Sequence, residues 1–298
     1  MPRLTIALLL ALTAVQTASA QDTLPYRNPH LSTEVRARDL LRRMTLEEKF
    51  WQLYMTPGDL TDTTTDHSHG VFGLQVPAAS SASADAQRIN TIQRYFVMQT
   101  RLGIPIVPFE EAVHGLVRPG ATVFPAAIGL AAAWDTSLMS QVASSIAEEA
   151  RSRGIRQALS PVVNLADDVR WGRVEETYGE DPWLASAMTR AYVSAFERAG
   201  VVATPKHFVA NVGAGGRDSY PIEVSRRRLE EYFFPPFRAA LSAGAQSVMT
   251  AYNSVDGVPA TQSRFLLTDI LRKQWNFDGF VISDAAATGG AVVLHHTE

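Results

Sequence analysis

Short apolar segments of strand length alternate with amphipathic segments of helical length along most of this 298-residue chain. Six apolar runs have the length and composition of buried strands: 70–76, 103–109, 156–163, 201–208, 247–252 and 279–283. Amphipathic segments expected to be helices lie between most of them, at 84–101, 136–153, 182–199, 227–243 and 264–274. Nearly continuous apolar strands that alternate with helices predict an α/β fold in which helices cover a parallel sheet.

Polar residues at the ends of these runs indicate which parallel fold to expect. They follow or close four of the runs: Glu110, Glu111, Lys206, His207, Tyr252, Asn253 and Asp284. In a (β/α) barrel the carboxyl ends of the strands converge on one face, which carries the active site. No Gly-x-Gly-x-x-Gly follows the first run, which argues against a dinucleotide-binding sheet. We therefore expect a TIM-like (β/α) barrel, and because six runs are two fewer than the eight strands of that fold, a barrel truncated at its C-terminus.

The segment before the first run divides into two parts. Residues 31–55 are expected to be helical, because Ser32 or Thr33, and later Thr45, are helix caps followed by acidic residues. Residues 59–69 are polar and rich in turn-forming residues, and we expect a loop there.

The first 20 residues have the three parts of a secretory signal peptide. Arg3 precedes an apolar run of 12 residues at 4–15, and small residues at 18–20 form a cleavage site. The run is shorter than the roughly 20 residues that span a bilayer. We therefore expect residues 1–20 to be removed, residues 21–298 to form one incomplete barrel domain, and the protein to be secreted or periplasmic without a membrane anchor.

Composition excludes several classes of function. A formal net charge of -3 provides no electrostatic basis for binding nucleic acid. The absence of cysteine excludes disulfides, thiolate nucleophiles and zinc–thiolate sites. A metal-dependent hydrolase would have to use histidines such as His114, His207, His295 and His296, but no His-x-His pair lies on an expected strand. We expect no metal.

Asp284 follows an expected strand and precedes three alanines. A carboxylate at the end of a buried strand is held by rigid backbone, and small residues beside it leave room for a ligand. Those properties suit the nucleophile of a glycoside hydrolase, which attacks an anomeric carbon from a fixed position. Aspartate is also a good helix N-cap, and local sequence alone favours neither role.

Three further groups of residues are able to bind sugar hydroxyls. Lys206 and His207 are neighbours whose side chains would point to opposite faces of a regular strand, so a shared ligand requires an unusual backbone, and we predict a non-proline cis peptide there. Arg173 offers forked hydrogen bonds, although its loop is equally able to be held together by its own Arg–Glu pairs. Glu111 is able to accept from two vicinal hydroxyls, and Glu110 is its competitor because alternation turns only one of them inward.

Six segments in this order resemble glycoside hydrolase family 3, in its β-glucosidase and β-xylosidase branch. They are LLRRMTLEEK at 40–49, EAVHG at 111–115, GRVEETYGEDP at 172–182, KHF at 206–208, MTAYN at 249–253 and SD at 283–284. The resemblance covers about residues 31–296. It implies a retaining exo-acting β-glycosidase that removes terminal glucose, or xylose, from oligosaccharides through a covalent glycosyl-enzyme intermediate and needs no cofactor.

The resemblance also implies a role for each matching position. Asp284 corresponds to the family's nucleophile. The set that binds the terminal sugar corresponds to Glu111, Arg173, Lys206 and His207, and the residues that line the same subsite are Met249 and Tyr252. Tyr252 is expected to lie close to the nucleophile. The side chains of this set should face one pocket.

Three departures from the family's pattern qualify this reading. Glu111 stands where many members have Asp, which narrows the pocket and favours a pentose or a shifted hexose. Residues 209–213 contain no His, which disfavours the branch that removes N-acetylglucosamine. The general acid/base Glu of the β-glucosidase branch usually comes from a second α/β domain, and we expect that domain to be missing here, so that this chain is weakly stable or inactive. The alternative from another class is a non-catalytic sugar-binding fragment.

Overall fold

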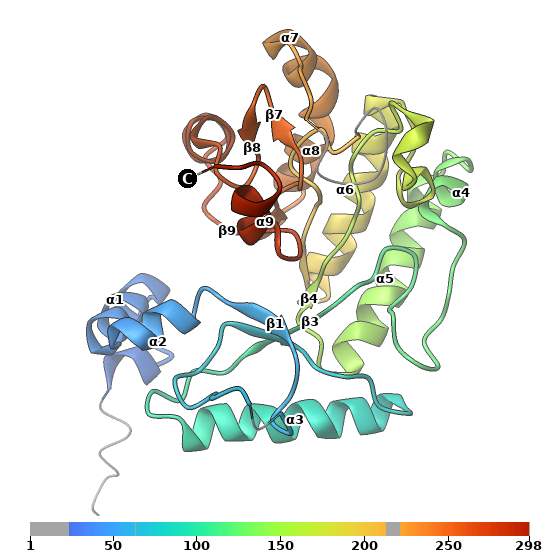
Figure 1. Ribbon diagram of the computed structural model, residues 1–298. Coiled ribbons are helices and arrows are strands. Elements are labelled where there is room, and N and C mark those ends of the chain that lie inside the picture. The colour runs from blue at the N-terminus through green and yellow to red at the C-terminus, as the bar shows by residue number, and fades with distance from the viewer. Residues whose placement is uncertain (1–23, 63, 213–220, 298) are drawn as a thin grey trace, which may run out of the picture. The chain divides into compact units, whose positions relative to one another are not determined.

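The computed structural model describes residues 24–62, 64–212 and 221–297 (Figure 1). The chain divides into two compact units, residues 1–52 and 53–298. The expected signal peptide at 1–20 lies outside the described residues. Within the part of the chain that the structure describes, every helix is too short or too polar to cross a bilayer.

The first unit contains η2 (Pro25–Arg27), α1 (Thr33–Arg43) and α2 (Leu46–Trp51). The expected caps are present: Ser32 caps α1, and Thr45 forms a capping box at the start of α2. The prediction of helical structure over residues 31–55 is wrong at its C-terminal end, because α2 stops at Trp51 and Met55 already belongs to a strand. Pro57 is consistent with the strand, since proline cannot continue a helix and forces the residue before it into an extended conformation.

The second unit is built on parallel strands, as expected. One sheet has the order β1 (Met55–Pro57), β2 (Gly73–Gln75), β3 (Val107–Glu110), β4 (Gln157–Ala158) and β5 (Val202–Ala203), and β6 (Ser247–Met249) pairs with β9 (Phe280–Ile282). Backbone bonds beyond β5 connect the two sheets: Phe208 N donates to Met249 O, and Ala251 N donates to Phe208 O. All these strand pairs are parallel.

Each of the six expected runs contains a strand, and β1 adds a seventh. The antiparallel hairpin of β7 (Ser254–Val255) and β8 (Val258–Pro259) was not expected. Among the described residues β1 pairs with β2 alone and β9 with β6 alone, so these two strands are the edges of the described sheet. The fold class is therefore α/β with a parallel, barrel-like strand order.

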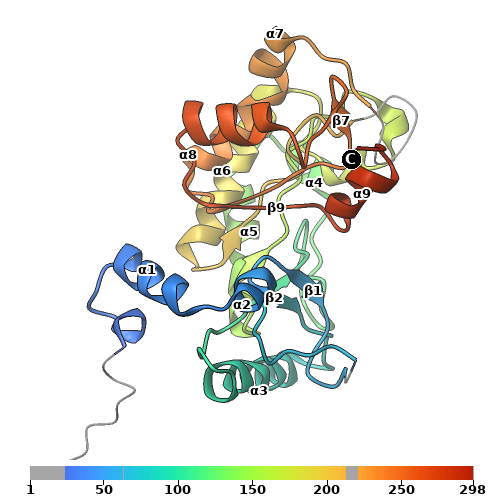
Figure 2. The ribbon, with the colours of Figure 1, turned by 60° about the vertical axis from the view of Figure 1, so that its left-hand side comes forward.

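Four predicted helices lie close to their expected positions: α3 (Ala82–Gln99), α5 (Thr136–Ser152), α6 (Pro182–Arg198) and η6 (Phe265–Gln274). The segment expected at 227–243 includes α8 (Pro235–Ser242), whereas α4 (Ala127–Ala131) and α9 (Ala287–Val293) were not expected. Helix α6 packs against both α5 and α8 (Figure 2). The prediction of a single helix at 227–243 is wrong. The segment is divided into α7 (Arg226–Arg228), the π-helical turn η5 (Leu229–Phe233) and α8, because Pro235 and Pro236 have no N–H to continue the hydrogen bonding.

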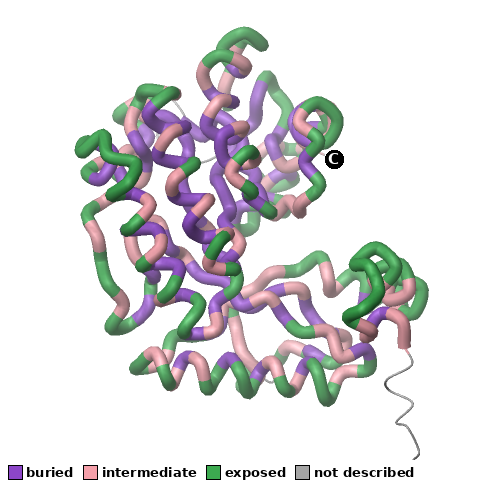
Figure 3. Tube along the Cα trace, turned by 180° about the vertical axis from the view of Figure 1, so that it is seen from behind, coloured by how far each residue is buried: buried purple, intermediate pink, exposed green. Residues whose placement is uncertain are grey.

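Buried side chains form two clusters in this unit. One includes Leu74, Phe96, Ile146 and Phe196, and it lies between the first sheet and α3, α5 and α6. The second surrounds Phe208 and contains residues from α8, β6 and η6. Helix α3 contributes one buried stripe, with exposed residues on its other side (Figure 3). Ala203 of β5 belongs to the first cluster and Phe208 to the second, so buried apolar residues flank Lys206 and His207 along the chain.

Candidate active site

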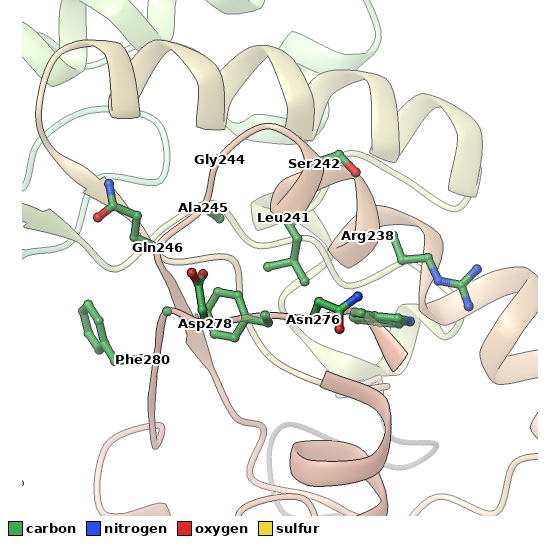
Figure 4. A pocket seen from close by; sticks show the side chains of 12 residues that line it. Arg238, Leu241, Ser242, Gly244, Ala245, Gln246, Asn276, Asp278 and Phe280 are labelled. Carbon is green, nitrogen blue, oxygen red and sulfur yellow. The ribbon is translucent and has the colours of Figure 1, made fainter. Parts of the chain in front are cut away.

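A cavity of about 670 Å³ lies at the carboxyl ends of β3 and β5. Its lining includes three of the expected sugar-binding residues, Glu111, Arg173 and Lys206. A second cavity, of about 800 Å³, lies at the opposite ends of β6 and β9 and is lined by residues such as Arg238, Gln246 and Asp278 (Figure 4). Only the first cavity contains side chains from the strand ends where a barrel carries its active site.

Glu111 and Glu110 have separate partners, which settles the competition between them. Both carboxylate oxygens of Glu111 accept from Lys206 Nζ, at 2.7 and 2.8 Å. Glu110 is buried and forms an ion pair with Arg118 at 2.8 Å. Glu110 also accepts from the backbone N of Glu111 at 2.9 Å, so it supports the residue that faces the cavity.

Arg173 lies in the loop between β4 and α6 and is 7% exposed. Its guanidinium makes a forked pair with Glu176, with distances of 2.7 and 2.8 Å, and stacks over Trp171 at 5.8 Å from the ring centre. The expected Arg–Glu pairing of the loop is therefore present, and Arg173 still lines the cavity. Asp181 ends the loop as the cap of α6 by accepting from Leu184 N at 2.7 Å.

The Lys206–His207 peptide is cis, as the sequence predicted. Both side chains are almost fully buried. Lys206 reaches Glu111 in the cavity, whereas His207 Nε2 lies 3.4 Å from Oδ2 of Asp284. These neighbours thus contact two different carboxylates of the expected set.

Asp284 follows β9 after one intervening residue, Ser283, and is 8% exposed. Its Oδ1 accepts from the neighbouring Ala285 N at 2.8 Å, and α9 is capped at Ala286 without a side-chain bond, so Asp284 does not act as the cap of that helix. Burial raises the pKa of Asp284 above its ordinary value, against the opposing influence of the Ala285 N–H and of Lys206.

Met249 is the last residue of β6, the strand that pairs with β9, and Tyr252 lies in the segment that follows. A hydrogen bond from the Tyr252 hydroxyl also acts to lower the pKa of Asp284, which places this side chain beside the carboxyl as expected. Met249 is buried in β6 opposite Ile282 of β9. The site set therefore comes from the ends of β3, β5, β6 and β9 and from the loop after β4.

Asn164 is a contact of this site that the sequence reading missed. It lies 2% exposed behind His207, whose backbone N and ring Nδ1 both donate to Asn164 Oδ1. Asn164 directly follows the expected strand at 156–163. The rule that identified the other strand-end residues would therefore have found it.

Two of the other histidines considered as metal ligands, His114 and His295, contact backbone in separate places. His114 Nδ1 contacts Phe124 O at 2.9 Å, and His295 Nε2 contacts Tyr252 O at 2.7 Å. Among residues 24–62, 64–212 and 221–297, no group of three acidic or histidine side chains is arranged to hold a metal ion.

Comparisons with known proteins agree on one family. The model of the glycosyl hydrolase family 3 N terminal domain matches residues 45–298. A periplasmic beta-glucosidase of Salmonella typhimurium is 34% identical over 285 residues, which cover 92% of this chain and 36% of that protein. A beta-xylosidase of Formosa agariphila is 40% identical over 214 residues, or 65% of this chain and 29% of that protein.

Solved structures show the same relationship. A beta-glucosidase from Erythrobacter marinus superimposes with a TM-score of 0.85 and 34% identity, over 92% of this chain and 39% of that one. The beta-glucosidase from Listeria innocua in complex with glucose gives a TM-score of 0.77 and 31% identity, over 90% and 39% of the two chains. This chain therefore spans well under half the length of these relatives.

Proposed function

This chain belongs to glycosyl hydrolase family 3, and on that premise we propose that it carries the sugar-binding site and the nucleophile of a retaining, exo-acting β-glycosidase. The substrate is a terminal, non-reducing β-linked glucose or, as second choice, xylose at the end of an oligosaccharide. The observation that carries the proposal is the position of Asp284, buried at the end of β9 beside His207 and within the influence of Lys206 and Tyr252.

The proposed reaction has two displacements at one carbon. Asp284 attacks the anomeric carbon while the glycosidic oxygen leaves and takes a proton from a general acid, which yields a glycosyl ester of Asp284. Water then attacks the same carbon from the face that the leaving group vacated, gives its proton to the conjugate base of the general acid, and displaces the Asp284 carboxylate. Two inversions restore the original configuration, and no cofactor takes part.

Glu111, Arg173 and Lys206 are proposed to hold the hydroxyls of the terminal sugar. Their polar atoms line the cavity, and they already form two charged pairs, Glu111 with Lys206 and Arg173 with Glu176. A sugar hydroxyl is able to donate to such a carboxylate and accept from such a cation. Met249 and Tyr252 are proposed to line the same subsite.

The general acid is proposed to come from a carboxyl group outside this set, in a second α/β domain of the protein. Glu111 and Glu176 each accept from a cation through both oxygens, which suits an ionised carboxylate and not a proton donor. We further propose secretion or a periplasmic location, supported by the signal-like sequence at 1–20 and by the periplasmic relative.

The test uses a substrate that needs no general acid. We expect a dinitrophenyl 2-deoxy-2-fluoro-β-glucoside to label the full chain with one sugar, because its leaving group departs without protonation and the fluorine slows hydrolysis of the ester. Mass spectrometry should place the label on Asp284. The Asp284→Asn variant should stay unlabelled, and the control Asp278→Asn, an exposed aspartate at the other end of β9, should label like the wild type.

Two outcomes would contradict the proposal. A label on a different carboxylate would remove Asp284 from its role. Glucose binding by calorimetry without any labelling would instead favour the sugar-binding fragment as the function of this chain.

A further inference from the structure

Asn164 holds His207 through three hydrogen bonds inside the protein. Its Oδ1 accepts from the backbone N of His207 at 2.8 Å and from ring Nδ1 at 2.9 Å, and its Nδ2 donates to the carbonyl O of His207 at 3.0 Å. The two residues are 2% and 1% exposed, so little water competes for these contacts. Such a site holds the imidazole ring in one position.

The two hydrogen bonds between the Asn164 side chain and the His207 backbone also determine the orientation of the Asn164 amide. Exchanging its oxygen and nitrogen would place an NH₂ group against a backbone N–H and an oxygen against a carbonyl oxygen. With the orientation so determined, Oδ1 faces ring Nδ1 of His207 and requires that this nitrogen carries a proton. A neutral His207 is therefore held with its proton on Nδ1 and a lone pair on Nε2.

That lone pair points toward a carboxyl group. His207 Nε2 lies 3.4 Å from Oδ2 of Asp284. A neutral ring and an ionised carboxylate would place two acceptors against each other, whereas one proton between them converts the contact into a hydrogen bond. The favourable states are thus an imidazolium beside a carboxylate or a neutral ring beside a carboxylic acid.

We propose that Asn164 is a positioning residue that fixes the Nδ1–H form of His207 and so makes His207 and Asp284 share one proton. The inference about the ring rests on the contacts alone. Its consequence for attack on a sugar rests on the proposed function. Of the two states in which the proton is shared, the one with the proton on Nε2 leaves Asp284 charged and able to act as the nucleophile.

Burial and neighbouring groups act on Asp284 in opposite directions. Burial has the larger influence and favours the neutral acid. The Ala285 N–H, the Tyr252 hydroxyl and the positive charges of Lys206 and Arg173 favour the ionised form. An imidazolium held at Nδ1 by Asn164 adds a further positive charge at Oδ2, which is the contribution that this inference assigns to Asn164.

Imidazole ¹⁵N NMR of the full chain, with labelled histidine and a His207→Gln variant for assignment, tests the inference. We expect Nδ1 of His207 to be protonated on both sides of its titration. In Asn164→Leu the acceptor is lost, so the neutral ring is able to place its proton on Nε2 and donate to Asp284. The neutral ring of His207 should then carry its proton on Nε2. The pH at which half of His207 is protonated should fall by about one to two units, which is the equivalent of one hydrogen bond to a charged group.

Two further variants keep the test decisive. Asn164→Asp retains the acceptor as a charge, so the Nδ1–H form should persist and the midpoint should rise by about one unit, because charge-assisted bonds are roughly twice as strong as neutral ones. Gln157→Leu removes another buried amide, one that donates to Thr204 and Ser247, and should leave the tautomer and the midpoint of His207 unchanged.

A wild-type His207 without a proton on Nδ1, or variants at Asn164 that leave tautomer and midpoint unchanged, would overturn the inference. A wild type that is never labelled would instead refute the proposed function, and the NMR result would still decide the role of Asn164.

Discussion

Asp284 occupies a position in which burial opposes its charge. Its pKa lies above the ordinary aspartate value because of desolvation, although Lys206, Arg173 and Tyr252 partly compensate. The native state therefore binds the proton of this carboxyl more tightly than the unfolded chain does. Burying the proposed nucleophile thus reduces the stability of the fold wherever Asp284 is ionised.

A pH-dependent effect on stability follows for Asp284→Asn. Because the folded pKa is raised, stability falls as pH rises from the unfolded value of about 3.9 through the folded pKa, and the loss is complete above that window. The amide should therefore raise Tm near neutral pH and change it little below about pH 3.9. Scanning calorimetry at the two pH values measures this. Asp278→Asn serves as the control, and a Tm lowered equally at both pH values would contradict the expectation.

A buried group of charges connects several elements behind the cavity. Asp85 of α3 accepts from Arg118 at 3.2 Å and from Arg153 at 2.9 Å, and Arg118 also pairs with Glu110 at the end of β3. Asp85, Arg118 and Arg153 are 1%, 6% and 4% exposed. Because Glu110 in turn bonds to the backbone of Glu111, this network links the helices to a residue that lines the cavity.

Removing the central carboxylate should be costly. Asp85→Ala removes the carboxylate that two buried arginines share and leaves Arg153 without its ion pair, although Arg118 keeps Glu110, so we expect a loss of about 3–5 kcal/mol in the free energy of unfolding. Asp269→Ala removes an exposed pair with Lys273 and should cost less than about 1 kcal/mol. Urea denaturation monitored by circular dichroism measures both. Equal losses in the two variants would show that the buried network does not stabilise the fold.

In the second unit, stability is expected to differ between the middle of the sheet and its edges. The residues of β4 are fully buried between β3 and β5, whereas those of β9 are half-buried and pair with β6 alone among the described residues. The proposed nucleophile follows this edge strand. The site thus joins a rigid binding set on the central strands to a nucleophile on a less protected strand.

Hydrogen exchange tests this difference. We expect the amides of β4 and β5 to exchange at least about tenfold more slowly than those of β9, because a half-buried edge strand opens at lower free energy than a central one. Mass spectrometry of peptides that cover the two regions, corrected for intrinsic exchange rates, measures the ratio. Equal protection would mean that the sheet opens as one cooperative unit.

Element types were largely predictable from the sequence because burial imposes a local pattern. The helices α5 and α6 begin at the expected residues, Thr136 and Pro182, since a cap and an amphipathic stripe are properties of neighbouring residues. The departures occur where pairing or proline overrides the pattern, as in β1 and at Pro235. The antiparallel hairpin that follows Asn253 was missed because its strands are only two residues long.

The sequence by itself determined the α/β class, the family and the strand-end residues from which the site is built, because hydrophobic periodicity and ordered motifs are local properties of the chain. Only the tertiary structure decided their partners: Glu111 with Lys206, Glu110 with Arg118, and His207 between Asn164 and Asp284. Those choices depend on the directions of side chains from strands far apart in the sequence. Hydrogen bonding and ionisation depend on such distances, which the order of residues does not contain.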